Sequence, residues 1–202
     1  MITIVDYGIG NLGSVQNMLK KVGAENEITD NHETIASASK ILFPGVGAFG
    51  TAMERLKERG MIDLLTRKVK VDKVPVLGIC LGMQLMTRSS EEGGLVQGLS
   101  WIDGRTVRFK FTDPTIKVPH KGWNVVRPAK QSALFTGQEE LKFYFDHSYY
   151  VSLERNEDQL LSTSYGLEFT SGFQCGNIFG VQFHPEKSHR YGMELLENFA
   201  KV

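Results

Sequence analysis

The chain of 202 residues is long enough for one ordinary domain with a buried core, and its 41% hydrophobic content excludes disordered and low-complexity classes. Its 23 basic and 23 acidic residues cancel, so we expect no nucleic-acid partner and no attraction to an anionic membrane. Residues 74–86 form the longest nearly apolar stretch, which is shorter than the roughly 20 residues of a membrane span. With no signal-peptide pattern, no C-x-x-C motif and two cysteines, the sequence predicts a cytoplasmic protein with free thiols, no metal and no cofactor.

Strands and helices alternate in the first half of the chain. β-Branched and apolar runs predict strands at residues 2–5, 27–29, 40–43 and 74–79, and apolar residues at helical spacing predict helices at 12–22, 48–59, 61–71 and 83–88. The run at 74–79 is almost uninterrupted, which is typical of a strand buried on both faces of a parallel sheet. This alternation predicts an α/β fold with a doubly wound, mostly parallel sheet.

The second half of the chain changes to a succession of strands. We expect them at residues 101–111, 117–126, 142–151, 160–165 and 168–183, followed by a closing helix at 188–202. Several of these segments alternate apolar and polar residues, which favours an antiparallel extension of the sheet. No internal repeat or flexible linker interrupts the sequence, so residues 1–202 are predicted to form a single domain.

A cysteine flanked by glycines follows the predicted strand at 74–79. Gly78-Ile79-Cys80-Leu81-Gly82 matches the G-x-nucleophile-x-G elbow with cysteine in place of serine. The tight strand-to-helix turn strains the central residue, and the glycines remove side chains that would collide there. The N-terminus of the next helix favours a thiolate, and the Leu81 N–H is a candidate oxyanion donor. The alternative is a buried structural cysteine.

A nucleophilic cysteine requires a base and a group that orients the base. His184 and Glu186 lie two residues apart, so in an extended chain their side chains point to the same side, and Pro185 stiffens the segment. Glu186 can therefore hold one imidazole nitrogen while the other faces Cys80. The remaining ionisable candidates receive no catalytic role: His32, His120, His147, His189 and Cys175, the last as a strand residue.

Two glycine-rich loops complete the candidate features. Residues 44–47, Pro-Gly-Val-Gly, follow the strand at 40–43 and can offer backbone N–H groups to an oxyanion. Residues 8–13 match G-x-G-x-x-G, with Asp30 about 20 residues further on, which is the dinucleotide-binding fingerprint. We favour the nucleophile over this alternative because the sequence offers no visible substrate site for hydride transfer.

The elbow, the His184-Pro185-Glu186 segment and the 44–47 loop occur in the order and spacing of class I, triad-type glutamine amidotransferases. The chain resembles that family over essentially its whole length. The resemblance implies a Cys80, His184 and Glu186 triad and an oxyanion hole formed by Leu81, Val46 and Gly47. It further implies the glutamine-binding residues, which are Gly47, Gln84, Ser148 and Tyr149.

Three further segments, residues 6–11, 119–124 and 184–188, look like the glutaminase subunits of imidazole glycerol phosphate synthases. This implies a heterodimer in which ammonia passes to a separate cyclase subunit, a (β/α)8 barrel. That subunit makes imidazole glycerol phosphate and aminoimidazole carboxamide ribonucleotide in histidine biosynthesis. We expect Asn11, Trp123 and Lys187 on the partner-facing side, with core packing as the alternative for Trp123.

Because a glutaminase working alone would waste glutamine, we expect the 44–47 loop to become a competent oxyanion hole only when the partner docks. Gly45 and Gly47 flank Val46 and can absorb a peptide flip. The rival hypotheses are another member of the superfamily, such as the glutaminase of pyridoxal phosphate synthase or a γ-glutamyl hydrolase, and a noncatalytic flavodoxin-like protein in which Cys80 is a redox sensor.

Overall fold

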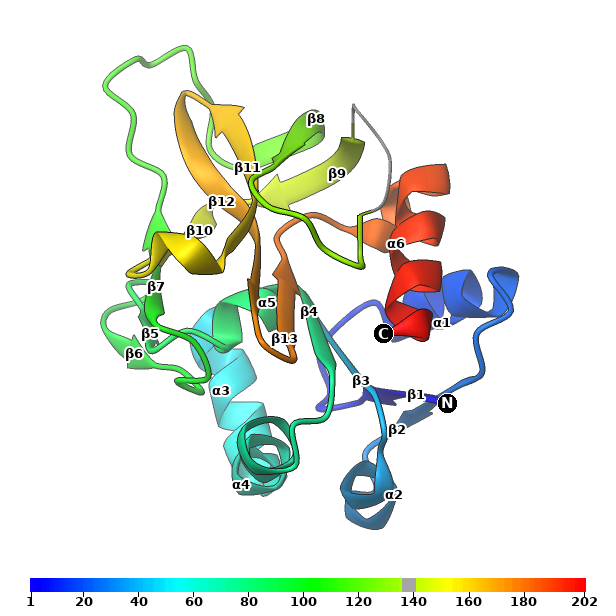
Figure 1. The fold of residues 1–202 in the computed structure, drawn as a ribbon. Helices are drawn as coiled ribbons and strands as arrows, with labels where there is room; N and C mark the ends of the chain where they lie inside the picture. The colour runs from blue at the N-terminus through cyan, green and yellow to red at the C-terminus, as the bar shows by residue number, and fades with distance from the viewer. Residues whose placement is uncertain (136–140) are drawn as a thin grey trace.

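The computed structural model of the chain describes residues 1–135 and 141–202 (Figure 1). Five parallel strands form one half of its sheet, in the order β2-β1-β3-β4-β13. Their bounds are β1 Ile2–Val5, β2 Asn26–Thr29, β3 Ile41–Gly45, β4 Val76–Cys80 and β13 Ile178–Val181. β4 lies between β3 and β13, and all five of its residues are buried, as its continuous apolar sequence predicts for a strand covered on both faces.

Helices cover both faces of these strands (Figure 1). One face carries α1 (Leu12–Lys21) and α6 (His189–Lys201), which pack against each other. The other face carries α3 (Phe49–Glu58) and α4 (Met61–Thr66), with α5 (Leu81–Leu85) following β4. Successive strand residues serve opposite cores: Leu42 belongs to the α1–α6 side and Phe43 to the α3–α4 side. The predicted doubly wound α/β fold is therefore confirmed.

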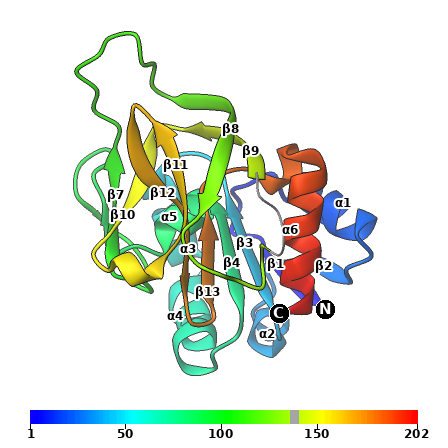
Figure 2. The same cartoon turned by 45° about the horizontal axis from the view of Figure 1, so that its top comes forward.

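The antiparallel extension begins at β12, which pairs with β13. The path continues through β10, β7, β5 and β6, while β11, β8 and β9 branch from β12 to form the upper layer seen in Figure 2. The bounds are β5 Ser89–Ser90, β6 Val96–Gln97, β7 Gly104–Arg108, β8 His120–Pro128, β9 Leu141–His147, β10 Tyr149–Leu153, β11 Gln159–Tyr165 and β12 Leu167–Cys175.

Four predicted strands are wrong in extent, and one of them, predicted at 117–126, is β8 at His120–Pro128. The segment 101–111 is a strand only at 104–108, because Trp101 turns into the core and its indole N–H donates to the Thr66 hydroxyl at 3.0 Å. The segment 142–151 divides into β9 and β10 at Ser148. The segment 168–183 is a hairpin, β12 and β13, that turns at Gly176 with φ +57°.

The structure also differs from the predicted helices. A short helix, α2 (His32–Ser37), was not predicted, although Asn31 accepts a hydrogen bond from the Thr34 N–H at 2.9 Å as an N-cap. The helix expected at 61–71 is α4 continued by a π-helical turn, Arg67–Val71. Short 3₁₀ turns lie at Asn156–Asp158 and Pro185–Lys187. In the parts of the chain that the structure describes, no helix is long and apolar enough to cross a membrane.

Candidate active site

Cys80 occupies a strained turn between β4 and α5. Its φ is +53° and its ψ −110°, a conformation that side-chain-bearing residues rarely adopt. A Cβ on Gly78 would lie 2.7 Å from the Met83 nitrogen, and a Cβ on Gly82 would collide with the Phe43 carbonyl oxygen. Both glycines are therefore needed for α5 to approach the sheet closely, and the elbow predicted from the sequence has a steric basis.

Strand register brings the other candidates to Cys80. Gly45 at the end of β3 lies opposite Cys80, and Val181 in β13 lies opposite Ile79. The carboxyl ends of β3, β4 and β13 therefore meet at one edge, where an open α/β sheet places its ligands. This edge collects the 44–47 loop, the nucleophile elbow and the segment that carries His184.

His184 is oriented by Glu186, whose carboxylate oxygen lies 2.8 Å from the imidazole Nδ1. Residues 185–187 form a 3₁₀ turn instead of the extended chain expected, and the pair still meets. The backbone N–H of His184 donates to the Tyr144 carbonyl at 2.8 Å, so β9 fixes the backbone position of His184. Burial opposes a charge on His184, but hydrogen bonds with Cys80 and Glu186 outweigh it and raise the pKa of the imidazole to about 10.

Tyr7, just after the end of β1, holds the first two residues of the 44–47 loop in place. The Tyr7 hydroxyl donates to the Pro44 carbonyl at 2.8 Å, and it fills the space that a Cβ on Gly45 would need. Burial, with the nearby charge of Cys80, raises the pKa of Tyr7 far above its usual range, so the hydroxyl stays a neutral donor. Beyond this anchor, Val46 is half exposed and Gly47 has φ +120° with open space around it.

A cavity of about 320 Å³ opens over Cys80. It is lined by Cys80, His184 and every residue expected in the oxyanion hole or around glutamine: Val46, Gly47, Leu81, Gln84, Ser148 and Tyr149. Ser148, at the break between β9 and β10, lies in this wall together with its neighbours His147 and Tyr149. Glu186 lies behind His184 and lines a neighbouring cavity of about 540 Å³ instead.

Sequence reasoning missed four residues of the wall, which are Glu92, Pro119, Asp146 and His147. Glu92 accepts a hydrogen bond from the Phe49 N–H at 2.8 Å, so its carboxylate lies at the N-terminus of α3. No motif surrounds Glu92, and a lone acidic residue in a loop offers no local signal. His147 directly precedes Ser148 and Tyr149, which are predicted to bind glutamine. This position in the sequence is the one signal that could have identified His147 as part of the cavity.

Two of the three residues expected to face a partner line the cavities described above. Asn11 and Lys187 both line the 540 Å³ cavity, and the Lys187 ammonium lies 5.4 Å from the centre of the Tyr144 ring. Trp123 is 47% exposed, which contradicts the core-packing alternative. Its indole stacks on His189 at 5.6 Å with an interplanar angle of 2° and meets Tyr144 edge-on.

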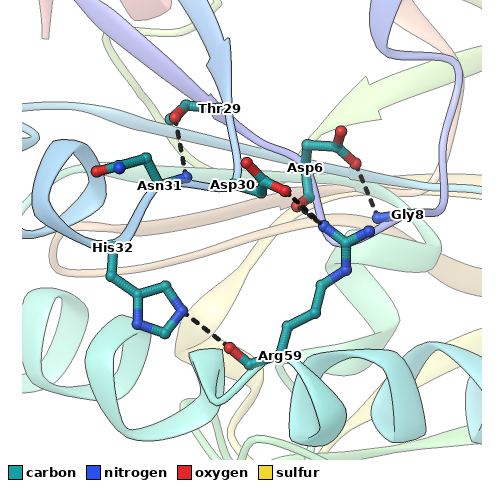
Figure 3. A network of polar contacts seen from close by, with 7 residues as sticks. All are labelled: Asp6, Gly8, Thr29, Asp30, Asn31, His32 and Arg59. Carbon is teal, nitrogen blue, oxygen red and sulfur yellow. Dashed lines mark hydrogen bonds and ion pairs between the residues drawn. The ribbon is translucent and has the colours of Figure 1, made fainter.

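The dinucleotide alternative is not supported by the surroundings of the 8–13 loop (Figure 3). The Arg59 guanidinium donates to the Asp6 carbonyl at 3.1 Å and to the Asp30 carboxylate at 3.2 Å. It lies 3.2 Å from the position of a Cβ on Gly8, so it fills the space beside the loop. Asp30 is thus engaged in an ion pair with Arg59, whereas the dinucleotide fingerprint uses this acidic residue as an acceptor for the ribose hydroxyl.

Neither cysteine forms a disulfide, and Cys175 ends β12 as expected of a strand residue. Within residues 1–135 and 141–202, no group of three or more His, Cys, Asp or Glu side chains could hold a metal ion. The 320 Å³ cavity brings the Cys80 sulfur and the charged imidazole of His184 together, with the 44–47 loop at its edge.

Comparison with known proteins gives consistent matches along the chain. The family model for class-I glutamine amidotransferases matches residues 3–202. The HisH 2 subunit of imidazole glycerol phosphate synthase from Methanococcus maripaludis is 51% identical and covers 100% of this chain and 99% of its own. The HisH 2 subunit from Pseudomonas aeruginosa is 47% identical, with both chains covered in full.

Solved structures share the fold at much lower identity. A crystal structure described as a glutamine amidotransferase aligns with a TM-score of 0.74 at 18% identity and covers 100% of both chains. A chain of PurLQS from Thermotoga maritima aligns with a TM-score of 0.74 at 15% identity, covering 99% of this chain and 97% of its own. At this identity the likeness shows the fold alone.

Proposed function

The chain belongs to the class I glutamine amidotransferases and, within them, to the HisH subunits of imidazole glycerol phosphate synthase, and from this premise we propose that it hydrolyses glutamine with a Cys80–His184–Glu186 triad. The observation that carries the proposal is the strained Cys80, which faces a histidine held at 2.8 Å by a buried carboxylate. Such strain persists only where the surrounding structure enforces it, and it is typical of reacting residues.

The first half of the reaction uses the charge pair of Cys80 and His184. The Cys80 thiolate attacks the side-chain amide carbon of glutamine and forms a tetrahedral oxyanion. The backbone N–H groups of Leu81 and Val46 hold the developing charge, with Gly47 allowing the loop to present them. The His184 imidazolium then gives its proton to the departing nitrogen, so ammonia leaves and a glutamyl thioester remains. The raised pKa of His184 supports this acid role at neutral pH.

The second half returns the site to its starting state. Neutral His184 takes a proton from water, which attacks the thioester, and the thiolate leaves as glutamate forms. Glu186 keeps the Nδ1–H side of the ring fixed, so that the other nitrogen faces the reacting atoms throughout. The acid and base roles thus fall on one imidazole.

Glutamine binding is assigned to residues of the 320 Å³ cavity: Gly47, Gln84, Ser148 and Tyr149. The Glu92 and Asp146 carboxylates line the same cavity and suit the α-ammonium group of an amino acid. Both amide hydrogens of Gln84 are used within the protein, on the Tyr149 carbonyl and the Gln182 side chain, so its Oε1 is the atom left to accept from a ligand.

We further propose that the ammonia passes to a separate cyclase subunit with a (β/α)8 barrel, which forms imidazole glycerol phosphate and aminoimidazole carboxamide ribonucleotide in the cytoplasm. The docking side would carry Asn11 and Lys187, which line the 540 Å³ cavity, and Trp123, which contacts the same Tyr144 ring as Lys187. A covered path is needed because ammonia in neutral water is mostly protonated and is then no nucleophile.

The test is a complex of this chain with its cyclase partner. Cys80→Ala should abolish glutamine use by the complex, while added ammonium salt at alkaline pH still drives the cyclase, because the acceptor site is on the partner. Loss of the ammonia-driven reaction in a folded Cys80→Ala complex would contradict this division of labour.

The redox-sensor hypothesis is separated from the glutaminase by one labelling experiment. A glutamine-analogue electrophile should label Cys80, and excess glutamine should protect it. Equal labelling by an electrophile without the amino-acid portion, with no protection by glutamine, would favour the sensor.

A further inference from the structure

A chain of buried hydrogen bonds runs from Cys80 to strand β8. Its members are Gln182, Gln84, the Tyr149 carbonyl, His147, His120 and Asn124. Gln182 is fully buried, and Gln84, His147 and His120 are each at most 5% exposed. Burying a polar side chain is costly unless its hydrogen bonds are made. The donors and acceptors of these buried side chains therefore have to be satisfied within the protein.

The Tyr149 carbonyl sets the direction of every bond in the chain. A carbonyl oxygen can only accept, and two donors meet there: the Gln84 Nε2 at 3.0 Å and the His147 Nδ1 at 2.8 Å. The orientation of the Gln84 amide and the tautomer of His147 are therefore fixed by one backbone atom. From this atom the chain divides into two arms.

The first arm ends at the reacting sulfur. The second N–H of Gln84 donates to the Gln182 Oε1 at 3.0 Å, which leaves Gln182 with its NH₂ group toward Cys80. The Gln182 Nε2 lies 3.7 Å from the Cys80 Sγ, a hydrogen-bond distance for sulfur. The backbone agrees with this placement, because Gln182 directly follows Val181, the residue opposite Ile79.

The second arm holds the Tyr149 carbonyl from the other side. Since His147 donates through Nδ1, its neutral ring must accept through Nε2, where the His120 Nδ1 donates at 2.9 Å. His120 in turn accepts at Nε2 from the Asn124 amide at 3.2 Å, which also donates to the Ser164 carbonyl. Burial lowers the pKa of His120 to about 4 and that of His147 to about 3, so both rings are neutral at physiological pH, as the arm requires.

We propose that Gln182 is a further catalytic residue of this site: its N–H donates to the Cys80 sulfur, stabilises the thiolate and holds it in line with His184. Gln84 is a positioning residue for Gln182, and His147 with His120 positions the carbonyl on which Gln84 rests. This assignment rests on the proposed function for its catalytic meaning, although the hydrogen bond itself does not.

The sulfur therefore has two donors of different kinds. His184 carries a mobile proton that it delivers to the leaving group, whereas the Gln182 amide keeps its protons at every step. When His184 loses its proton to ammonia, the Gln182 N–H remains as a donor next to the sulfur. A hydrogen bond to the charged form of a group favours that form, which eases departure of the thiolate from the thioester.

Alkylation of Cys80 by iodoacetamide measures thiolate reactivity without glutamine turnover. The wild-type chain, Gln182→Met and Gln182→Glu are compared at pH 7.5, with the modified cysteine identified by peptide mass spectrometry. Methionine has a similar length and removes the donor. Glutamate keeps the acceptor for Gln84 but presents a carboxylate to the sulfur. We expect a Cys80 rate about tenfold lower for Gln182→Met, as for loss of one charge-assisted hydrogen bond, and lower still for Gln182→Glu.

Thr163→Val is the matched control for a buried polar loss. Thr163 is fully buried, and its hydroxyl donates to the Ser171 hydroxyl at 2.8 Å, away from Cys80. The control should lose a comparable amount of thermal stability and keep the wild-type alkylation rate. An equal fall in Thr163→Val would mean that general loosening slows the thiol, and it would overturn the proposal.

If Gln182→Glu does not fold, comparing the Cys80 alkylation rates of Gln182→Met and the wild type is sufficient to test the proposal. A folded Gln182→Met protein that alkylates at the wild-type rate would refute the role of the N–H. Inactivity of the wild-type complex toward glutamine, with a tenfold alkylation difference intact, would instead contradict the proposed function and the catalytic meaning of Gln182, while the effect of its hydrogen bond on the Cys80 sulfur would stand.

Discussion

Glu186 and His184 are neighbours in the proposed triad, and we expect them to contribute unequally to catalysis. The buried Glu186 carboxylate accepts at 2.8 Å from the imidazole to which we assign the proton transfers. We expect His184→Ala to abolish glutamine use nearly as fully as Cys80→Ala, because members of a triad act as a unit. Glu186→Gln keeps an acceptor for Nδ1 and loses only the charge, so its loss should be about a hundredfold smaller.

Steady-state glutaminase rates of the three variants in the partner complex measure this difference. Their ammonia-driven rates serve as the control for folding and docking. Equal losses in Glu186→Gln and His184→Ala would contradict an orienting role for Glu186.

The buried histidines predict how stability depends on pH. Burial lowers the pKa values of His120 and His147 to about 4 and 3, while an unfolded histidine titrates near 6.5. The unfolded chain therefore binds protons that the folded chain cannot, and stability falls as the pH drops from about 6.5 toward 4. For His184 burial is outweighed by its bonds to Cys80 and Glu186, and the raised pKa of about 10 costs stability as the pH rises from about 6.5.

The free energy of unfolding, measured in urea at pH 5, 6.5 and 9, tests both the expected loss of stability at low pH and the expected loss at high pH. His120→Gln should lose less stability than the wild type between pH 6.5 and 5. His184→Gln should lose less between pH 6.5 and 9. Parallel pH profiles for the variants and the wild type would show that these histidines do not carry the linkage.

At the scale of elements, the loop after β3 is the part of the site with the most conformational freedom. It is anchored up to Gly45 by Tyr7, whereas Val46 is half exposed and Gly47 has φ +120°, with no neighbouring atom within 4 Å of the place a Cβ would take. We expect partner docking with acceptor nucleotide to shift this loop to the competent oxyanion hole. One oxyanion donor is typically worth about 10²–10³ in rate, so a single misdirected peptide would be enough to silence the resting site.

Glutaminase rates for the chain alone, with partner, and with partner plus acceptor ligand test this gating. Gly47 has a positive φ, so Gly47→Ala strains the backbone of the loop although the added Cβ meets no other atom. We expect this variant to reduce the stimulation of the glutaminase rate by the partner more than it changes glutamine binding. Gly94→Ala is the matched control, because Gly94 has φ +112° and equally open surroundings. Equal wild-type rates under the three conditions would contradict a gated loop.

At the scale of the whole molecule, Trp123 tests where the partner binds. Trp123 lies in β8, is 47% exposed, and stacks on His189 at the start of α6. Truncating a central tryptophan anchor typically costs about 2 kcal/mol of binding or more. Trp123→Ala should weaken docking and coupling to the partner by that amount while the melting temperature stays nearly unchanged.

Calorimetric titration with the cyclase partner, alongside thermal unfolding, provides the measurement. Leu95→Ala is the control, because Leu95 is an exposed apolar residue at 76% and carries no role in the proposed interface. Wild-type affinity in Trp123→Ala would remove Trp123 from the docking surface.

Local sequence patterns were sufficient for most of the elements. Apolar runs and helical spacing identified β1, β3, β4, α1 and α3, because each buries its own periodic face whatever lies around it. Two of the errors lie where a single residue interrupts a segment that is otherwise typical of one long strand: Ser148 separates β9 from β10, and the chain turns at Gly176 between β12 and β13. Helix α2, at six residues, carries too few apolar positions for a periodic signal.

The sequence by itself was sufficient to propose the reacting groups, since Cys80 lies near two glycines and His184 lies two residues from Glu186, and both patterns are local. The tertiary structure alone decided that Glu92, Asp146 and His147 share the cavity and that Gln182 meets the sulfur. The physical reason is range. Backbone strain and near-neighbour hydrogen bonds are set within a few residues, whereas the register of β4 with β3 and β13 joins atoms that are far apart along the chain, with a separation of 102 positions between Cys80 and Gln182.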